Sequence, residues 1–226
     1  MEISPDALVF FRFKMFSLNG TILFTWLIMA LMTVGSWLIT RRLSSEVRVS
    51  RWQILLEAIV SGIQGEIREI FSRERRGFLP FLGTLFLFIA VSNVLAVVPG
   101  FQPPTGSLST TSALAVCVFL AVPIYGISEV GGLNYLRNYL QPSFFMLPFN
   151  VMGDFSRTLA LAVRLFGNVM SSTMIGAILL AIAPLLFPVV MQLFGLLTGL
   201  VQAYIFAILA AVYIRAGMEV QTREKV

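Results

Sequence analysis

Apolar runs long enough to cross a lipid bilayer constrain the fold of this chain more than any other feature. Stretches of about 20 apolar residues recur along the sequence, and a helix of about that length spans the ~30 Å hydrocarbon core of a membrane. Hydrophobic residues make up 58% of the 226 residues and charged residues 12%, with a mean hydropathy of +0.88. Too little polar surface remains to coat a soluble globule. The sequence therefore predicts an all-α integral membrane protein that forms a single membrane domain over residues 1–226.

Five membrane-crossing helices and one surface helix account for the pattern. The expected crossings are residues 21–40, 78–98, 108–127, 148–183 and 188–215. At about 1.5 Å per residue, the fourth helix is roughly 50 Å long and must lie strongly tilted in a bilayer. Pro184 and Pro188 bracket the turn that follows it. We therefore expect the last two helices to form a long, tilted hairpin.

Residues 50–73 are predicted to form an amphipathic surface helix. Apolar residues recur there at helical spacing, while charged and amide residues occupy the rest of the helical wheel. The apolar positions are Trp52, Leu55, Leu56, Ile59, Val60, Ile63, Ile67 and Ile70. Such a helix lies on the cytoplasmic membrane face or packs against a partner helix.

Basic residues give the chain its expected orientation. The segment between the first two crossings carries Arg41, Arg42, Arg48, Arg51, Arg68, Arg73, Arg75 and Arg76. By the positive-inside rule this segment is cytoplasmic. The N-terminus is then outside, despite Arg12 and Lys14, and five crossings leave the C-terminus in the cytoplasm. The loop at 101–107 has no Lys or Arg, so we expect it to be external.

Arg164 is the residue that points most directly to a function. It lies in a strongly apolar run, about sixteen residues from either end of its predicted helix, which is too deep for snorkelling to the headgroups. A guanidinium at bilayer depth costs roughly 2.5–3.5 kcal/mol on insertion scales, and it keeps its proton in proteins. A permanent positive charge in a membrane interior is typical of an ion path.

Polar residues on the two long helices surround this position. On the wheel, Arg157, Asn168 and Ser171 share a stripe with Arg164. Asn168 and Ser171 are also suited to helix–helix hydrogen bonding, and headgroup contact is the favoured interpretation for Arg157. On the last helix, Gln202 is an amide in an apolar run, and the guanidinium of Arg164 across the hairpin is its expected hydrogen-bond partner.

Five short motifs give the chain a family resemblance. They are Gln-Pro at 141–142, Leu-Pro-Phe-Asn at 147–150, Asp-Phe-Ser-Arg at 154–157, Arg-Leu-Phe-Gly-Asn at 164–168 and Gln-Ala-Tyr-Ile-Phe at 202–206. With these motifs the chain resembles subunit a of the F-type ATP synthase of bacteria and chloroplasts. The likeness covers about residues 78–219, and the last two motifs are highly specific to that family. The short N-terminal region and the basic loop suggest a divergent bacterial subclass.

The resemblance implies a stator subunit beside a rotating ring of c subunits. In that family two offset aqueous half-channels meet the ring carboxylates near the membrane midplane, and ion flow is coupled to rotation and to ATP synthesis or hydrolysis. Arg164 matches the essential arginine of the family, Gln202 matches the glutamine that faces it, and Asn168 belongs to the same motif. The resemblance further implies b-type peripheral stalk subunits as partners, indirect contact with the F1 sector, no catalytic centre in this chain, and a place in the bacterial inner membrane.

Several positions depart from the family pattern. Many relatives have a glutamate where this chain has Thr173, and some have a histidine at the position of Gly195. The external half-channel is then expected to be lined by the hydroxyls of Ser171, Ser172 and Thr173. The wheel places Ser171 on the side of Arg164 and Thr173 on the far side. Further half-channel candidates are Asp154, Arg157 and Asn93.

The transported ion stays open between two alternatives. Protons are the default, while hydroxyl and carbonyl oxygens also solvate sodium. The chain has no histidine and a single cysteine, and no Gly-rich phosphate loop, so we expect no cofactor, no metal site, no bound nucleotide and no nucleic-acid partner. A secondary transporter is a more remote alternative, because such proteins usually show paired repeats and broken helices.

Overall fold

The computed structural model describes residues 9–13, 16–41, 51–71, 76–98, 100–131, 146–182 and 187–219. The Gln-Pro motif at 141–142, the turn residue Pro184 and part of the basic segment, 42–50, lie outside the described residues.

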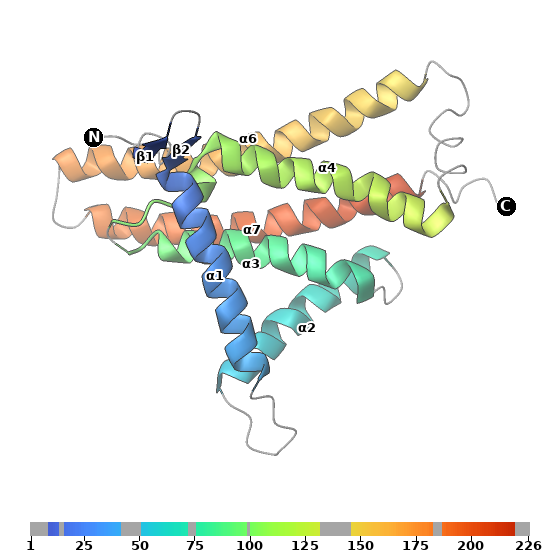
Figure 1. Cartoon of the computed structure of the whole chain (residues 1–226), viewed down its shortest axis with the longest axis horizontal. Helices are drawn as coiled ribbons and strands as arrows, with labels where there is room; N and C mark the ends of the chain where they lie inside the picture. Colours follow the sequence, from blue (N-terminus) through green and yellow to red (C-terminus); the bar gives the residue numbers. More distant parts are fainter. Residues whose placement is uncertain are drawn as a thin grey trace.

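Four helices lie side by side and form the body of the molecule (Figure 1). They are α3 (Leu79–Leu95), α4 (Leu108–Val130), α6 (Met146–Ile182) and α7 (Phe187–Glu219). The last of these, α7, contacts each of the other three. Its central position means that its side chains decide how the whole bundle packs.

Small and branched side chains fill the centre of the bundle. Ala203 and Ala210 of α7 are fully buried, as are Leu161 and Leu165 of α6 and Ile89 of α3. Between helices in a membrane, association depends on close van der Waals packing rather than on exclusion of water. Alanines at these positions let α7 approach its neighbours closely.

The two long helices agree closely with expectation. Helix α6 has 37 residues and α7 has 33, which correspond to roughly 56 Å and 50 Å at about 1.5 Å per residue. They run antiparallel as a hairpin (Figure 1). Helix α7 continues to Glu219, beyond the expected end at 215.

The number of crossings is only partly supported by helix length. Among the described helices, four are long and apolar enough to cross a membrane: Gly20–Leu38, Leu108–Ser128, Pro148–Ile182 and Phe187–Met218. Helix α3 has 17 residues, roughly 26 Å, and is shorter than the expected 78–98. It ends in a turn, and the positive φ of Gly100, 90°, then redirects the chain, a conformation that glycine adopts without strain.

Helix α1 (Gly20–Thr40) runs steeply across the bundle (Figure 1). Before it, β1 (Val9–Phe13) and β2 (Phe16–Asn19) pair antiparallel. The all-α prediction is therefore wrong for this short hairpin and correct for the described chain after it. The first strand, Val-Phe-Phe-Arg-Phe, consists mainly of residues that favour extended backbone, and neither segment is long enough to show helical periodicity.

The amphipathic helix α2 (Arg51–Phe71) matches the helix predicted at 50–73. It packs against α3 and α7, which is one of the two arrangements expected for it. The hydroxyl of Tyr204 on α7 donates to Oε1 of Glu66 at 2.7 Å, and Arg215 donates to the carbonyl of Ile70 near the end of α2. Two polar contacts therefore tie α2 to α7.

Candidate functional site

The α6–α7 hairpin has a register that can be read from two contacts. Asn168 Nδ2 donates to the carbonyl of Thr198 at 3.3 Å, and a Cβ on Gly195 would lie 3.6 Å from the Cβ of Ser172. The two helices run antiparallel, so the next turn of each brings Arg164 to the level of Gln202. The two motifs recognised in the sequence thus meet midway along the hairpin.

The expected hydrogen bond between Arg164 and Gln202 is not formed. Gln202 is 5% exposed, and its buried Nε2 has no hydrogen-bond partner in the part of the chain that the structure describes. Arg164 is exposed and makes no hydrogen bond or ion pair with the described residues. Leu161 and Leu165 occupy the inward face of α6, which turns the guanidinium outward. The two residues share a level along the hairpin but face different surroundings.

A cavity of about 510 Å³ lies beside the hairpin, between the level of Arg164 and the turn that joins α6 to α7. It lies between α3, α6, α7 and the segment at 101–103. Its polar lining consists of Asn93, Gln102, Asn168, Ser172, Thr173 and Gln192. The structure thus brings together three of the residues expected in a half-channel, Asn93, Ser172 and Thr173, with Asn168 of the Arg-Leu-Phe-Gly-Asn motif.

Ser171 does not line this cavity; it is exposed on α6. The wheel places Thr173 on the side of α6 opposite Arg164, and in the structure that side, together with Ser172, lines the cavity, whereas Arg164 does not. Ser172 Oγ donates to the carbonyl of Asn168 at 3.0 Å, and Thr173 Oγ1 donates to that of Val169 at 2.9 Å. Both hydroxyls are held by their own helix.

Asn93 joins α3 to α7 beside the cavity. Its Nδ2 donates to the carbonyls of Ile89, at 2.9 Å, and of Gly199, at 3.1 Å. A Cβ on Gly199 would lie 2.7 Å from Cγ of Asn93, so only glycine fits at that position. The close approach of the two helices depends on this pair.

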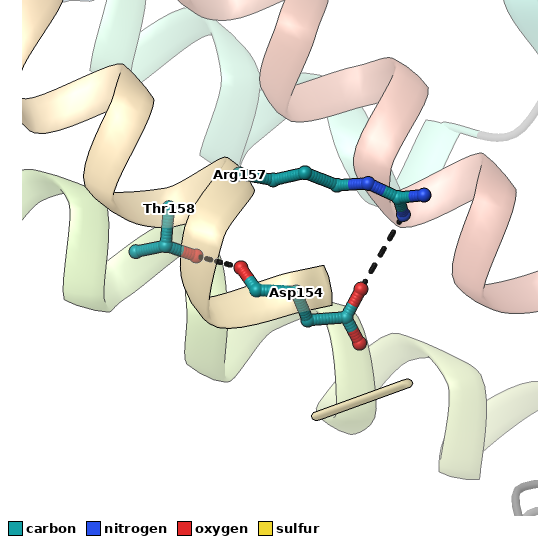
Figure 2. Close-up of polar contacts among 3 residues, drawn as sticks. All are labelled: Asp154, Arg157 and Thr158. Atoms are coloured by element: carbon teal, nitrogen blue, oxygen red, sulfur yellow. Dashed lines mark hydrogen bonds and ion pairs between the residues drawn. The ribbon is translucent and has the colours of Figure 1, made fainter. Parts of the chain in front are cut away.

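Asp154 and Arg157 lie on the other side of Arg164 along α6. Arg157 Nη1 is 3.4 Å from Asp154 Oδ1, and Thr158 Oγ1 donates to the Asp154 carbonyl at 2.8 Å (Figure 2). The Arg157 side chain is 53% exposed, and an exposed pair of this kind contributes about 0–1 kcal/mol to stability. The pair is not part of the cavity lining.

Two cavity residues were missed by the sequence analysis. Gln192 Nε2 donates to the carbonyl of Val97 at 3.3 Å. It shares a wheel face with Gly199, seven residues later, and as a polar residue in an apolar run it carried a usable signal. Gln102 carried none, because it lies in an irregular loop. In the part of the chain that the structure describes, no group of three or more His, Cys, Asp or Glu side chains could hold a metal ion.

Long apolar helices, a polar cavity between them and a lone guanidinium midway along a helical hairpin define the class of ion-translocating membrane proteins. The family described as "ATP synthase A chain" matches residues 22–215. The chain belongs to this family, subunit a of the F-type ATP synthase, in the membrane-embedded Fo sector. This assignment replaces the alternative of a secondary transporter.

Individual relatives match over nearly the whole chain. The chain is 60% identical over 220 residues to "ATP synthase subunit a 2" of Acaryochloris marina, covering 97% of this chain and 94% of the relative. It is 61% identical over 217 residues to "ATP synthase subunit a" of Nitrosospira multiformis, covering 96% and 86%. It is 55% identical over 224 residues to "ATP synthase subunit a 1" of Crocosphaera subtropica, covering 99% and 97%.

Proposed function

We propose that this chain forms the two ion half-channels against a ring of c subunits and couples proton translocation to rotation and to ATP synthesis or hydrolysis. The observation that carries the proposal is the place of Arg164. It is exposed at the level of Gln202, midway along the α6–α7 hairpin, and has no partner among the described residues. A charged group left exposed on an apolar helix requires a partner from outside the chain.

The surroundings of Arg164 fit a ring of apolar helices bearing carboxylates. Val163, Leu197 and Val201 are 53%, 61% and 49% exposed, so the exposed surface of the hairpin near the level of Arg164 includes apolar side chains from both helices. A ring carboxylate that reaches it is stabilised as an anion by Coulomb attraction, which is strong in a low dielectric. Arg164 thereby favours ion release from the ring.

The fixed charge also separates the two half-channels. A cation passing directly between them would meet the guanidinium and be repelled. Gln202 is buried at the same level. In the proposed function its amide and local water moderate the attraction, so that the ring carboxylate can leave again.

The cavity lined by Asn93, Asn168, Ser172 and Thr173 is assigned to the external half-channel. Asp154 and Arg157 are assigned to the cytoplasmic end, where Arg157 also contacts headgroups. Either a proton, carried by water, or a sodium ion can be solvated by these oxygens. Protons are the proposed ion and sodium is the alternative.

In the proposed arrangement α3 also crosses the membrane, although it is short, and brings the number of crossings to five. The α6–α7 hairpin is strongly tilted. The N-terminus is outside and the C-terminus is cytoplasmic. The location is the bacterial inner membrane. The partners are the c ring, b-type peripheral stalk subunits, lipid and, indirectly, the F1 sector.

Two measurements test this function. In the purified complex in liposomes, Arg164→Ala should abolish ATP-driven ion uptake while the c ring still co-purifies. Normal pumping by the variant would refute the role of Arg164, and absence of a c ring from the wild-type preparation would refute the partner. ATP-driven uptake with and without sodium, with a protonophore present, distinguishes the ions: uptake that survives the protonophore and needs sodium identifies sodium.

A further inference from the structure

Helix α2 is held against α7 by two long side chains of α7. The hydroxyl of Tyr204 donates to Glu66 Oε1 at 2.7 Å. Further along α7, Arg215 donates to the carbonyl of Ile70, near the end of α2. Tyrosine and arginine reach their partners over a distance that short side chains cannot cover. The part of α7 between these two contacts is therefore free to stand back from α2.

A slot of about 240 Å³ lies there, between α2, α3 and α7. Short residues on both helices create it, Ala58 and Gly62 on α2 and Ala207 and Ala211 on α7. Isoleucines of α2 and α7 and Phe86 of α3 complete an apolar wall. The slot shares no lining residue with the cavity beside the α6–α7 hairpin. It is a separate feature on another face of α7.

The slot opens to the surroundings of the protein. Ala58 and Gly62 are exposed, and Tyr204 is 44% exposed. An apolar cavity of about 150 Å³ already takes a molecule the size of benzene and stays free of water, and this slot is larger. An amphipathic helix such as α2 lies at the boundary between lipid headgroups and acyl chains. An acyl chain is therefore the apolar group that can reach the slot.

The slot also carries a charge. Glu66 is the only charged residue in its lining within the part of the chain that the structure describes. The hydrogen bond from Tyr204 to Glu66 is exposed, so the pair lies where the slot opens. The second carboxylate oxygen of Glu66 makes no hydrogen bond or ion pair with the described residues. An ammonium group, with one positive charge and three hydrogens to donate, complements that oxygen.

We propose that this slot binds one acyl chain of a phospholipid with a primary-amine headgroup, whose ammonium donates to Glu66. The apolar wall selects a chain, and the carboxylate selects the headgroup. The bound lipid fills the gap between α2 and α7 and stabilises their contact. Binding at this site needs neither Arg164 nor a c ring, so it goes beyond the function proposed above.

Photo-cross-linking measures the occupancy of the slot. The purified complex is placed in liposomes with a trace of phospholipid that carries a diazirine on its acyl chain. The headgroup is ethanolamine, choline or glycerol, with identical chains. Adducts within residues 58–70 and 204–211 should be roughly fivefold more frequent with ethanolamine than with choline, which corresponds to about 1 kcal/mol. The anionic glycerol lipid should give the fewest.

Two results of this measurement would overturn the proposal. Equal labelling by the three lipids would show that the headgroup is not selected. Absence of adducts from both ranges would show that no acyl chain enters the slot, as when a neighbouring subunit fills it.

Two glycines of α2 provide a matched pair of variants. A Cβ added at Gly62 or at Gly65 would meet no atom within 4 Å among the described residues, but only Gly62 lines the slot. Gly62→Leu should therefore remove most of the slot adducts, and Gly65→Leu should leave them unchanged. Adducts that survive in Gly62→Leu at the wild-type frequency would place the chain elsewhere.

Glu66→Gln tests the headgroup contact by itself. The amide oxygen can still accept from Tyr204, so the contact between the helices is kept while the charge is lost. The preference for ethanolamine over choline should disappear, and labelling by the choline lipid should stay the same. A preference that persists would contradict the role of Glu66.

A competition in the wild-type complex covers the case in which Glu66→Gln does not assemble. Free decylamine and decanol have the same chain, but only the amine carries a charge. Decylamine should displace the ethanolamine lipid from the slot at a roughly fivefold lower concentration. Equal displacement by the two compounds would refute recognition of the amine.

Discussion

Asn93 on α3 and Gly199 on α7 are joined at a point where no side chain could fit between them. The amide of Asn93 donates to the Gly199 carbonyl at 3.1 Å, and a Cβ at 199 would lie 2.7 Å from the Asn93 Cγ. One glycine thus sets both the distance between two helices and the position of an amide beside the cavity.

Gly199→Ala should destabilise the protein by about 1–3 kcal/mol, because the added methyl group must displace Asn93 or its helix. Thermal unfolding in detergent measures the effect. Gly153→Ala is the control, since a Cβ added at Gly153 would meet no atom within 4 Å among the described residues. In an Asn93→Ala background the cost should fall, and a cost that stays the same would disprove the clash.

Gln202→Leu should impair ATP-driven transport less than Arg164→Ala does. Gln202 is 5% exposed and its Nε2 has no hydrogen-bond partner among the described residues, so leucine, which is similar in volume, removes little packing. Transport rates are compared at equal amounts of assembled complex. Equal loss in both variants would show that the amide, and not only the guanidinium, is indispensable.

Cysteines at 172 and 173, in a background without Cys117, should react with membrane-impermeant thiol reagents from the outer side, and their modification should block transport. Ser172 and Thr173 line the cavity, whereas Ser171 does not. Modification of a cysteine at 171 should therefore leave more transport than modification at 172. The reverse order would place the aqueous path on the exposed face of α6.

Tyr204→Phe should weaken the attachment of α2 to α7 by about 0.5–1.5 kcal/mol, the usual net contribution of a hydrogen bond. Its hydroxyl donates to Glu66 at 2.7 Å. Thermal unfolding of Tyr204→Phe, Glu66→Gln and the double variant forms a double-mutant cycle. Strictly additive effects would mean that this contact contributes nothing to stability.

The helices and the pairing of motifs followed well from sequence because both depend on local pattern. Apolar length predicts α6 and α7 within a few residues, and helical geometry places Arg164 midway along the hairpin. Side-chain direction was harder. The wheel relates Thr173 to Arg164 correctly, but only packing decides which face meets a cavity, and here the cavity faces α3 and α7.

Two further features depend on contacts distant in sequence. Gln102 enters the site because its loop is fixed by the Ser92–Thr105 hydrogen bond, and nothing in the local sequence indicates this. Gln202 is buried but does not contact Arg164, because Leu161 and Leu165 occupy the inner face of α6. Such arrangements depend on how side chains from segments distant in sequence pack against one another.

Thr198 and Gly199 are consecutive on α7, yet their carbonyls accept from different helices, Asn168 of α6 and Asn93 of α3. Successive residues on a helix point about 100° apart, so the two bonds resist displacement in different directions. A ring turning against the hairpin would exert a sideways load on it. In the proposed function, the middle of α7 is braced against that load one turn from the level of Arg164, and this bracing would keep the charge aligned with the passing carboxylates while torque is transmitted.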